Sequence, residues 1–502
     1  MNDQWDRQAG VAMSDQWDRQ AGVTMSDQWD RQADVVVLGM GAAGCAAAIA
    51  ATDAGASVLL LEKMPEGREG GNTRISGGIW FNSLDPDGMA VYLRSLCGPY
   101  TLPEPVVQVW AQETYKNTEW LESLGVTPGV HADYQPEYPE MPGAEFYGGY
   151  LGVNGEMGRQ LLFKALSAAV RDRGVEVLLD TPAKELVTGE DGSVIGVVAS
   201  SGGAPLRVGA RRGVVLATGG FENNPEMVRD YLQLPGSPVW GSPAGTGDGI
   251  KMAQKVGADL WHMDNMAATL GLAADGFEAG MYVMFIFSQG FICVGNDGRR
   301  PHNEIPPQGH GHGLINGAYE LFQRRPLQVV FDEATRLAGP ISPPREILPV
   351  GWNLLMEGYE WSADNSAEID KGWILAGDTP AELAERLGVD PEGLEASVEA
   401  WNQACAAGHD PLGRPRATLT PLETPPFYGF TSAPLLGWTN GGPRRNEKAQ
   451  VLDPFGEVIG RLYAAGTVSS TYSWCKDGGF HIGDALAFGR VAGRSAAAET
   501  PR

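Results

Sequence analysis

The stretch Asp34–Glu62, which reads DVVVLGMGAAGCAAAIAATDAGASVLLLE, decides the fold. Val35–Leu38 is a short β-branched apolar run, typical of a strand that is buried on both faces. An alanine-rich segment follows and predicts a helix that ends near Gly55. Val58–Leu61 then predicts a second buried strand. A strand, a helix and a second strand in this order indicate a Rossmann-like unit of an α/β fold.

Between the first strand and the helix, the pattern G-x-G-x-x-G consists of Gly39, Gly41 and Gly44. In such a unit the first glycine allows a tight turn and the second lets backbone N–H groups approach a pyrophosphate. The third lets helix and strand pack closely. Glu62 ends the second strand, where it can accept hydrogen bonds from ribose hydroxyls. A structural glycine turn is the alternative, but the full constellation predicts a dinucleotide site.

Composition narrows the class of protein. The chain has 502 residues, 43% of them hydrophobic and 20% charged, which is ordinary for a globular protein with a large core. A formal net charge of −25 argues against nucleic acid or an anionic membrane surface as a partner. The five cysteines are scattered without a C-x-x-C pair, which fits a reducing cytoplasm. We therefore expect a cytoplasmic protein that does not bind membranes.

The two ends of the chain suggest a division into domains. Residues 1–33 contain three near-copies of MSDQWDRQAG and are predicted to form a flexible tail, with an interaction motif as the alternative. Residues 34–248 carry the dinucleotide motif, and residues 423–502 again show a strand, a glycine turn and an alanine-rich helix predicted to open at Gly483. We therefore expect a nucleotide-binding domain split in sequence, with a capping domain of α+β character inserted at residues 249–422.

Several motifs together resemble the fumarate reductase/succinate dehydrogenase flavoprotein superfamily. They include DVVVLGMGAAG, LLLEK, GGNTRISGG, VVLATGGFENN, NDGRRPHNE, GGPRRNEKAQVLD and GGFHIGDALAFGRVAG. Within this superfamily, the soluble FAD-dependent 3-ketosteroid dehydrogenases look most similar. The resemblance implies an FAD-binding domain with a capping domain, and a substrate held between them against the flavin.

The resemblance also implies which residues hold FAD. The implied set is Gly39, Gly41, Ala42, Ala43, Gly44, Glu62, Lys63, Gly71, Asn72, Thr73, Ser76, Gly77, Gly78, Ala217, Thr218, Gly219, Asp248, Gly466, His481 and Ile482. In succinate dehydrogenases a histidine of the flavin loop bonds covalently to FAD. Asn72 takes that position here, so we expect non-covalent FAD.

Fumarate reductases of this superfamily carry a catalytic arginine after the N-E of the capping domain. Here Asn303-Glu304 is followed by IPPQGHGHGLING, which contains no arginine. Arg300 precedes this segment and is a candidate substrate contact. The departure argues against fumarate reduction.

Desaturation next to a carbonyl requires a base for the α-proton, a donor for the developing enolate and a flavin to accept the β-hydride. We expect the enolate donor to be the backbone N–H of Gly441 or Gly442, although these glycines could serve close packing alone. Tyr472 is the candidate base, with Lys476 nearby to lower its pKa. A wall position for Tyr472 is the alternative. His481 is a further candidate base or substrate contact.

Three histidines gather in the predicted capping domain. They are His302, His310 and His312. We expect His310 and His312 to meet a polar group of the substrate and expect no metal site, because Glu304 is the one nearby carboxylate. Trp80 and Trp438 are candidate pocket walls.

These observations predict an FAD-dependent dehydrogenase acting on a CH–CH bond beside a carbonyl. The expected substrate is a cyclic ketone, either a 3-ketosteroid or a smaller ring with or without a carboxylate. A separate electron acceptor is also expected. A fumarate- or enoate-type reductase fed by an external donor is the alternative, and a non-catalytic flavin-binding protein is a third possibility.

Overall fold

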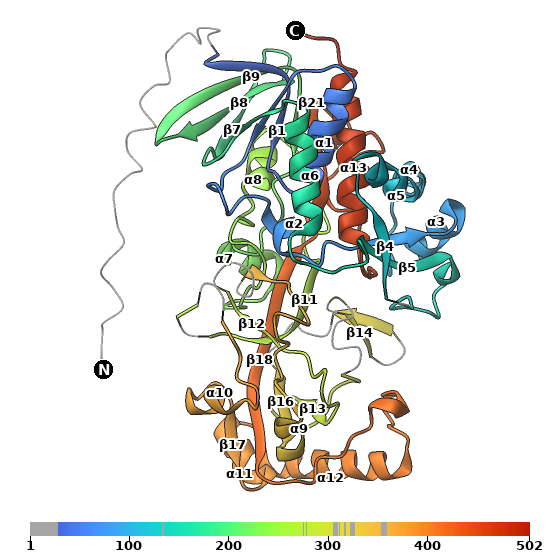
Figure 1. Ribbon diagram of the computed structural model, residues 1–502, viewed down its shortest axis with the longest axis vertical. Helices are drawn as coiled ribbons and strands as arrows, with labels where there is room; N and C mark the ends of the chain where they lie inside the picture. Colours follow the sequence, from blue (N-terminus) through green and yellow to red (C-terminus); the bar gives the residue numbers. More distant parts are fainter. Residues whose placement is uncertain are drawn as a thin grey trace.

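The computed structural model describes residues 29–132, 135–274, 276–277, 279–304, 310, 312–315, 318–321, 327–352 and 359–502. The molecule is elongated, with a larger lobe that contains both β1 and the C-terminus and a smaller lobe at the opposite end (Figure 1). The repeats at residues 1–28 lie outside the described residues.

The larger lobe is built on a sheet that takes strands from both ends of the chain. Its main path runs β20 (Gln450–Leu452), β21 (Val458–Ala464), β9 (Ala204–Leu216), β1 (Arg31–Leu38), β2 (Val58–Leu61) and β6 (Glu176–Leu178). The strands β7 (Ala183–Thr188) and β8 (Val194–Ser201) extend β9 as an antiparallel ribbon. Leu38 at the end of β1 lies opposite Leu61 and Leu216 in parallel register. Both predicted strands of the opening stretch are therefore present, at the centre of this sheet.

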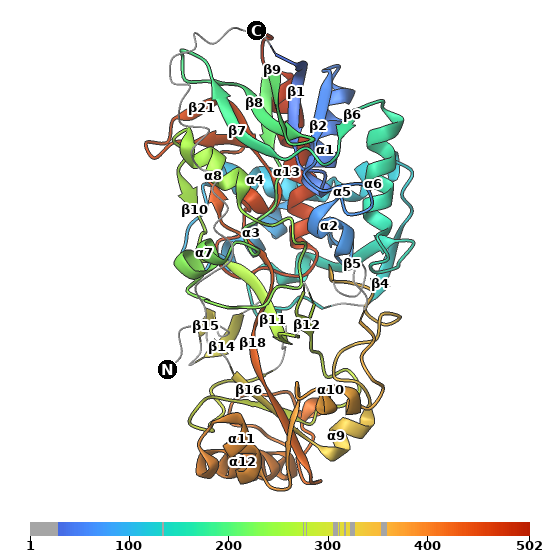
Figure 2. The same cartoon turned by 90° about the vertical axis from the view of Figure 1, so that its left-hand side faces the viewer.

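Two glycine- and alanine-rich helices pack against each other beside this sheet. They are α1 (Ala42–Asp53) and α13 (Phe480–Ala497), and both views place them side by side (Figures 1 and 2). A Cβ atom at Gly489 would lie 2.5 Å from Ala43 O, and one at Gly493 would lie 2.2 Å from Ala47 O. Glycine is therefore required at both positions for the helix backbones to approach this closely.

The end of the expected tail belongs to the folded domain. The chain enters β1 at Arg31. The ring of Trp29 covers Gly209, whose Cβ would lie 2.8 Å from the indole, and the Arg207 guanidinium stacks 5.2 Å from the Trp29 ring centroid. The predicted boundary at residue 33 was therefore too late, because the third repeat supplies this tryptophan and the first residues of a strand.

The smaller lobe is built on an antiparallel sheet with the order β12 (Met281–Tyr282), β11 (Met266–Leu272), β18 (Phe427–Thr439), β16 (Leu327–Asp332) and β13 (Phe291–Val294). The short strand β17 (Leu375–Gly377) also pairs with β18. The long strand β18 runs between the lobes (Figure 1). Two capped helices, α11 (Pro380–Leu387) and α12 (Pro391–Ala407), pack on this lobe. The Thr379 side chain caps the first helix, and Gly388 ends it.

A third, small sheet belongs to the larger lobe. It has the order β3 (Trp80–Ser83), β5 (Tyr147–Val153) and β4 (Pro128–Ala132). Beside it lie α3 (Pro86–Ser95), α4 (Glu104–Tyr115) and α5 (Asn117–Ser123). The remaining elements are α2 (Gly71–Ile75), α6 (Leu161–Asp172), α7 (Pro225–Met227), α8 (Asp248–Lys255), β10 (Leu260–Trp261), β14 (His312–Ile315), β15 (Ala318–Leu321), α9 (Glu333–Ala338), α10 (Ser366–Asp370) and β19 (Gly442–Pro443).

Two details differ from the sequence-based expectations. The last helix begins at Phe480 rather than at Gly483, because Gly479 adopts φ +75° and turns the chain into the helix three residues earlier. The strands of the second sheet lie within residues 266–439, whereas the expected capping domain spans residues 249–422. Before it, α8 packs into the core of the larger lobe, and β10 pairs with β19.

Candidate functional site

A cavity of about 480 Å³ is lined by residues of both lobes. Its wall includes the glycine turn after β1, the flavin-loop helix α2, the cap strands β11 and β18, and the first turn of α13. The carboxyl end of β1 and the amino ends of two helices therefore face one space, which is the usual position of a nucleotide in such sheets.

The three glycines of the opening motif have different surroundings. A Cβ at Gly39 would lie 2.4 Å from Ala217 O, and one at Gly44 would lie 1.9 Å from Gly39 O. At Gly41 the nearest atom would be Thr73 Oγ1, at 3.4 Å. Gly39 and Gly44 therefore serve close packing, whereas Gly41 keeps its backbone open toward the cavity.

Two acidic residues anchor the cavity at its nucleotide end. The Glu62 carboxylate accepts the backbone N–H groups of Met40 and Met64, both at 2.9 Å, and burial raises its pKa. Lys63 Nζ donates to Asp248 Oδ2 at 2.8 Å. These bonds tie the end of β2 to the glycine turn and to the start of α8.

The cofactor residues implied by the resemblance converge on this cavity. All of them except Gly44 line it: Gly39, Gly41, Ala42, Ala43, Glu62, Lys63, Gly71, Asn72, Thr73, Ser76, Gly77, Gly78, Ala217, Thr218, Gly219, Asp248, Gly466, His481 and Ile482. Gly44 lies behind them at the packing contact with Gly39. Segments far apart in sequence are thus brought to one surface.

The cavity wall contains polar atoms that the protein leaves without hydrogen bonds. Among the described residues, these buried atoms are Thr218 Oγ1, Glu222 Oε2, Trp240 Nε1, Thr269 Oγ1 and Trp438 Nε1. Such atoms are costly unless a ligand or water satisfies them. With the open glycine backbone at Gly41, they fit a large ligand with many polar atoms, as FAD is.

The Asn72 side chain, on α2, is held by hydrogen bonds to residues outside that helix. Its Nδ2 donates to Glu222 Oε1 at 2.8 Å, and its Oδ1 accepts the Ser242 N–H at 2.7 Å. Burial raises the pKa of Glu222 to about 7. A carboxyl that titrates near neutrality therefore lies beside the loop that is expected to contact the flavin.

A row of buried hydrogen bonds ends at His481, which lines the cavity. Lys476 Nζ donates to Asn265 Oδ1 at 2.7 Å, and the same oxygen accepts Asn440 Nδ2 at 2.7 Å. Asn440 Oδ1 then faces His481 Nε2 at 2.8 Å. Burial, Lys476 and His310 hold the pKa of His481 well below its usual value, so the imidazole is neutral.

A carboxylate and a histidine from different parts of the chain meet at the same end of the cavity. His310 Nδ1 lies 2.9 Å from Glu137 Oε2, and both residues line the cavity. The Glu137 backbone N–H donates to Asp477 Oδ2 at 2.9 Å. The His310 ring lies 6.4 Å from the His481 ring and 5.9 Å from the Trp438 ring.

The structure gives Tyr472 and Trp80 packing roles. The Tyr472 hydroxyl donates to Phe480 O at 2.6 Å and accepts from Trp110 Nε1 at 3.0 Å. Burial raises its pKa well above 10, and its ring is not part of the cavity wall. Trp80 is buried and donates to Thr118 Oγ1. Neither side chain reaches the site that the sequence assigned to it.

The remaining expected residues also lie behind the cavity wall. A Cβ at Gly442 would lie 1.7 Å from Val468 O, and one at Gly441 would lie 2.5 Å from Met263 Cα, so both glycines serve close packing. Lys476 is fully buried and acts on His481 through the asparagines rather than on Tyr472. His312 is buried, with its ring 4.8 Å from that of Trp474. Of the expected catalytic and substrate contacts, His310, Trp438 and His481 line the cavity.

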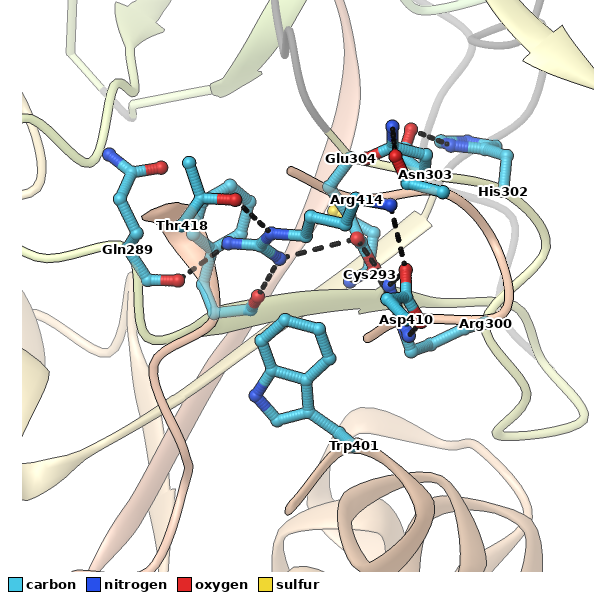
Figure 3. A network of polar contacts seen from close by, with 12 residues as sticks. Gln289, Cys293, Arg300, His302, Asn303, Glu304, Trp401, Asp410, Arg414 and Thr418 are labelled. Atoms are coloured by element: carbon cyan, nitrogen blue, oxygen red, sulfur yellow. Dashed lines mark hydrogen bonds and ion pairs between the residues drawn. The ribbon is translucent and has the colours of Figure 1, made fainter. Parts of the chain in front are cut away.

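Arg300 belongs to a buried ion cluster in the smaller lobe and not to the substrate site expected from the sequence (Figure 3). Its guanidinium bonds both Glu304, at 2.7 Å, and Asp410, at 2.9 Å. Arg414 bonds Glu304 from the other side at 3.2 Å, and both guanidinium groups stack on Trp401. His302 lies next to this cluster and is buried as well.

Several lining residues were not identified from the sequence. They are Glu137, Tyr150, Glu222, Trp240, Gly478 and Gly479. The pair Gly478-Gly479 could have been found, because two glycines directly before a helix mark an exposed helix N-terminus. Glu137 lies in a loop without any motif, so the sequence carries no local signal for it.

The described residues contain no group of three or more histidines, cysteines or acidic residues that could hold a metal ion. Within the same residues, no helix combines the length and the apolar character needed to cross a membrane.

Comparisons with known proteins give consistent matches. A family model described as an FAD binding domain matches residues 34–480. Urocanate reductase from Eggerthella lenta is 30% identical over 488 residues, which cover 92% of this chain and 74% of the relative. A 3-oxosteroid 1-dehydrogenase from Mycolicibacterium smegmatis is 28% identical, with 92% of this chain and 97% of the relative covered.

A solved structure supports the fold. The 3-ketosteroid Δ1-dehydrogenase from Sterolibacterium denitrificans superposes with a TM-score of 0.79 at 24% identity, covering 93% of this chain and 100% of that chain. The α/β fold of this chain is therefore shared with that structure.

Proposed function

Since this chain belongs to the FAD-binding flavoprotein family of fumarate reductase and succinate dehydrogenase, and is an FAD-dependent oxidoreductase of CH–CH bonds, we propose that it desaturates a cyclic ketone beside the carbonyl. One observation carries this proposal. The described part of the cavity combines a broad apolar wall with a short polar end and contains no arginine.

The apolar wall fits a hydrocarbon ring. It includes Met157, Trp240, Tyr282, Met284, Leu348, Val350 and Trp438. A polar end of the wall is formed by Glu137, His310 and His481, beside the Trp438 ring. A ligand with one carbonyl on an apolar ring system matches this division, because it buries carbon against carbon and offers its oxygen to the polar end.

The charges of the wall favour a neutral substrate. Recognition of a carboxylate normally uses the paired N–H groups of an arginine. The one lysine in the described lining, Lys63, is bonded to Asp248 and Thr246 at the nucleotide end. Glu137 would repel a carboxylate at the polar end, so the carboxylated ring considered from the sequence is less well supported.

FAD fits the nucleotide end, and we propose that it is held without a covalent bond. Gly41 would lie against the pyrophosphate, and Glu62 would accept from the ribose. Asn72 replaces the flavin-linked histidine of related enzymes, and its amide is engaged by Glu222 and Ser242. The flavin supplies hydride acceptance when bound, and an external electron acceptor then reoxidises it.

The first turn of α13 supports the same assignment of the flavin end. The N–H groups of His481 and Ile482 lie in the first helical turn, where no carbonyl of the same helix can accept them. Both residues line the cavity at the positive end of the helix dipole. This turn is suited to stabilise negative charge on a reduced flavin.

The reverse reaction, reduction of an activated C=C bond, is the second candidate. It would use the same proton and hydride groups, and the relatives of this chain include reductases such as the urocanate reductase of Eggerthella lenta. The direction depends on the external donor or acceptor, so both directions belong in the test.

The test uses the purified full chain with its bound flavin under anaerobic conditions. We expect a saturated 3-ketosteroid or a substituted cyclohexanone to bleach the flavin absorbance, and an artificial acceptor to restore it. Acid precipitation should release the flavin into the supernatant if it is non-covalent. If no cyclic ketone bleaches the flavin, while fumarate or an enoate reoxidises the dithionite-reduced enzyme, the desaturase proposal is excluded.

A further inference from the structure

We propose that His310 is the catalytic proton acceptor, with Glu137 as the residue that positions it. This inference rests on the proposed desaturation and assigns its proton step to a pair that no sequence motif indicated. Three independent observations support it: the hydrogen bond between the two side chains, the backbone conformation of His310, and the position of the pair in the cavity.

The hydrogen bond determines the tautomer of His310. Glu137 Oε2 lies 2.9 Å from His310 Nδ1, and an ionised carboxylate can only accept. In the neutral ring Nδ1 therefore carries the proton, and Nε2 has the lone pair. In the part of the chain that the structure describes, Nε2 has no hydrogen-bond partner. A neutral imidazole whose far nitrogen is held by a carboxylate is the arrangement that hydrolases use for a general base.

The backbone of His310 is strained. Its φ is +45°, a conformation that costs a non-glycine residue on the order of 1–3 kcal/mol. Such a conformation persists only where the surrounding contacts enforce it. Here the Glu137 hydrogen bond and the ring contacts with Trp438 and His481 hold the side chain toward the cavity.

Glu137 is itself held in place from behind. Asp477 Oδ2 accepts both the Glu137 backbone N–H, at 2.9 Å, and the Tyr92 hydroxyl, at 2.6 Å. Asp477 Oδ1 accepts the Gly478 N–H at 2.7 Å. The Asp477 carboxylate therefore couples the position of the base pair to the glycine turn that opens α13.

His310 is a better candidate than the other titratable groups at this end. The His481 imidazole shares its Nε2 with Asn440 and is near Lys476, which disfavours a second positive charge. The Tyr472 hydroxyl is fully engaged in the core. By contrast, the imidazolium formed on His310 would be stabilised by the Glu137 carboxylate at once.

Desaturation breaks two C–H bonds of the substrate, one by loss of a proton and one by loss of a hydride. The bond from the substrate α-carbon to hydrogen breaks, and the proton goes to His310 Nε2. The electron pair left behind forms the α,β double bond as the β-hydrogen leaves with its electron pair as hydride to the flavin. The substrate is oxidised by two electrons, the flavin is reduced by two, and the proton on His310 passes to solvent before the next turnover.

The pair is tested by separating proton transfer from hydride transfer. With the flavin reduced by dithionite, hydride cannot be accepted, but a base can still exchange α-deuterium of a bound saturated ketone with solvent. We expect the reduced wild-type enzyme to release α-deuterium. The variant His310→Ala should exchange at least 100-fold more slowly and should reduce flavin at least 100-fold more slowly in the oxidised state. Added imidazole should restore both rates at least tenfold.

Glu137→Gln should lower both rates by tenfold or more without weakening ketone binding, measured from the flavin spectrum. His409→Gln and Glu145→Gln remove an exposed histidine and an exposed carboxylate elsewhere and should leave both rates within twofold. Flavin content reports folding of each variant, and His310→Gln replaces the alanine variant if the latter loses flavin.

Two outcomes would overturn the inference: exchange at the wild-type rate in the His310 variant, or a loss of exchange that imidazole does not restore while His310→Gln exchanges normally. Failure of the proposed function would look different, because the wild-type enzyme itself would then not be bleached by any cyclic ketone.

Discussion

Asn440 determines the tautomer of His481 at the end of a row of buried side-chain amides. Asn265 Nδ2 donates to Trp474 O at 2.9 Å and Lys476 Nζ donates to Asn265 Oδ1, so that oxygen is an acceptor and the Asn440 atom facing it must be the Nδ2 donor. Asn440 Oδ1 is then the acceptor that faces His481, and His481 Nε2 must carry the proton. The orientation of every group in the row follows from the contacts of Asn265 with Trp474 O and Lys476.

This row predicts a defined nitrogen spectrum for His481. Histidine-specific ¹⁵N labelling should show His481 as a neutral ring protonated at Nε2, and Asn440→Leu should remove the acceptor and give a mixture of tautomers. His262 provides an internal control, since its Nδ1 lies 3.1 Å from Ser470 O and must be the protonated nitrogen in both proteins. An unchanged His481 spectrum in the variant would show that this row of hydrogen bonds does not determine the tautomer.

Alanine substitutions at the glycines of the opening motif should have different effects on stability and on FAD binding. Gly44→Ala places a methyl group 1.9 Å from Gly39 O and should destabilise the fold by about 1–3 kcal/mol or prevent folding. Gly41→Ala meets nothing closer than 3.4 Å and should leave thermal stability of the apoprotein nearly unchanged while lowering FAD affinity at least tenfold. Calorimetry and flavin titration distinguish the two. Equal FAD affinity in Gly41→Ala and wild type would contradict a pyrophosphate contact there.

Local sequence geometry explains what could be predicted. The strand, the turn and the helix of the opening stretch are set by the spacing of Gly39, Gly41 and Gly44, and the helix after Thr379 is set by its cap. These features depend on neighbours within a few residues. The residues that line the nucleotide end were implied by the resemblance of such motifs to the flavoprotein family.

The polar end could not be predicted in the same way. Glu137 and His310 are 173 residues apart; Glu137 lies in no motif, and the glycine-rich sequence around His310 does not fix the direction of its side chain. Tyr472 and Lys476 are close in sequence to residues that line the cavity. Their side chains nevertheless point into the core, where they form hydrogen bonds with Trp110, Phe480 and Asn265. Side-chain direction depends on such tertiary contacts, which sequence spacing does not encode.

Glu222 should make the stability of the apoprotein depend on pH. Burial raises its pKa from 4.5 in the unfolded chain to about 7 in the folded one, so ionising it in the folded state costs free energy. The cost is absent below pH 4.5, grows as pH rises to about 7, and is complete above that; it amounts to roughly 3 kcal/mol. Glu222→Gln removes the ionisation.

The gain in melting temperature of Glu222→Gln over wild type should therefore be small at pH 5 and several degrees larger at pH 8, measured by calorimetry on apoprotein. Glu226→Gln, on the adjacent helix and exposed, should show no such difference. A gain that is larger at pH 5 than at pH 8 would contradict the raised pKa.

Arg300 should matter for stability and not for substrate binding. Arg300→Met leaves the buried Asp410 carboxylate without its partner, and breaking one side of a buried ion cluster costs about 3–5 kcal/mol (Figure 3). Arg229→Met removes an exposed pair with Asp230 and should cost less than about 1 kcal/mol. Denaturant unfolding measures both, and ketone affinity of the folded enzyme should be unchanged. If Arg300→Met weakened ketone binding more than it lowered the free energy of unfolding, Arg300 would again be a candidate substrate contact.

Tyr472→Phe separates the base assigned from the sequence from the one inferred from the structure. The hydroxyl accepts from Trp110 and donates to Phe480 O in a buried core, so its loss leaves an indole N–H without an acceptor and should cost about 1–3 kcal/mol of stability. The rate of flavin reduction per folded enzyme should stay within about threefold of wild type, because His310 would still accept the proton. Tyr463→Phe is the matched control, since that hydroxyl is bonded to Glu499 at 2.8 Å in the same core and away from the cavity wall. If Tyr472→Phe slowed flavin reduction 100-fold while Tyr463→Phe did not, Tyr472 would take the role of the base and His310 would lose it.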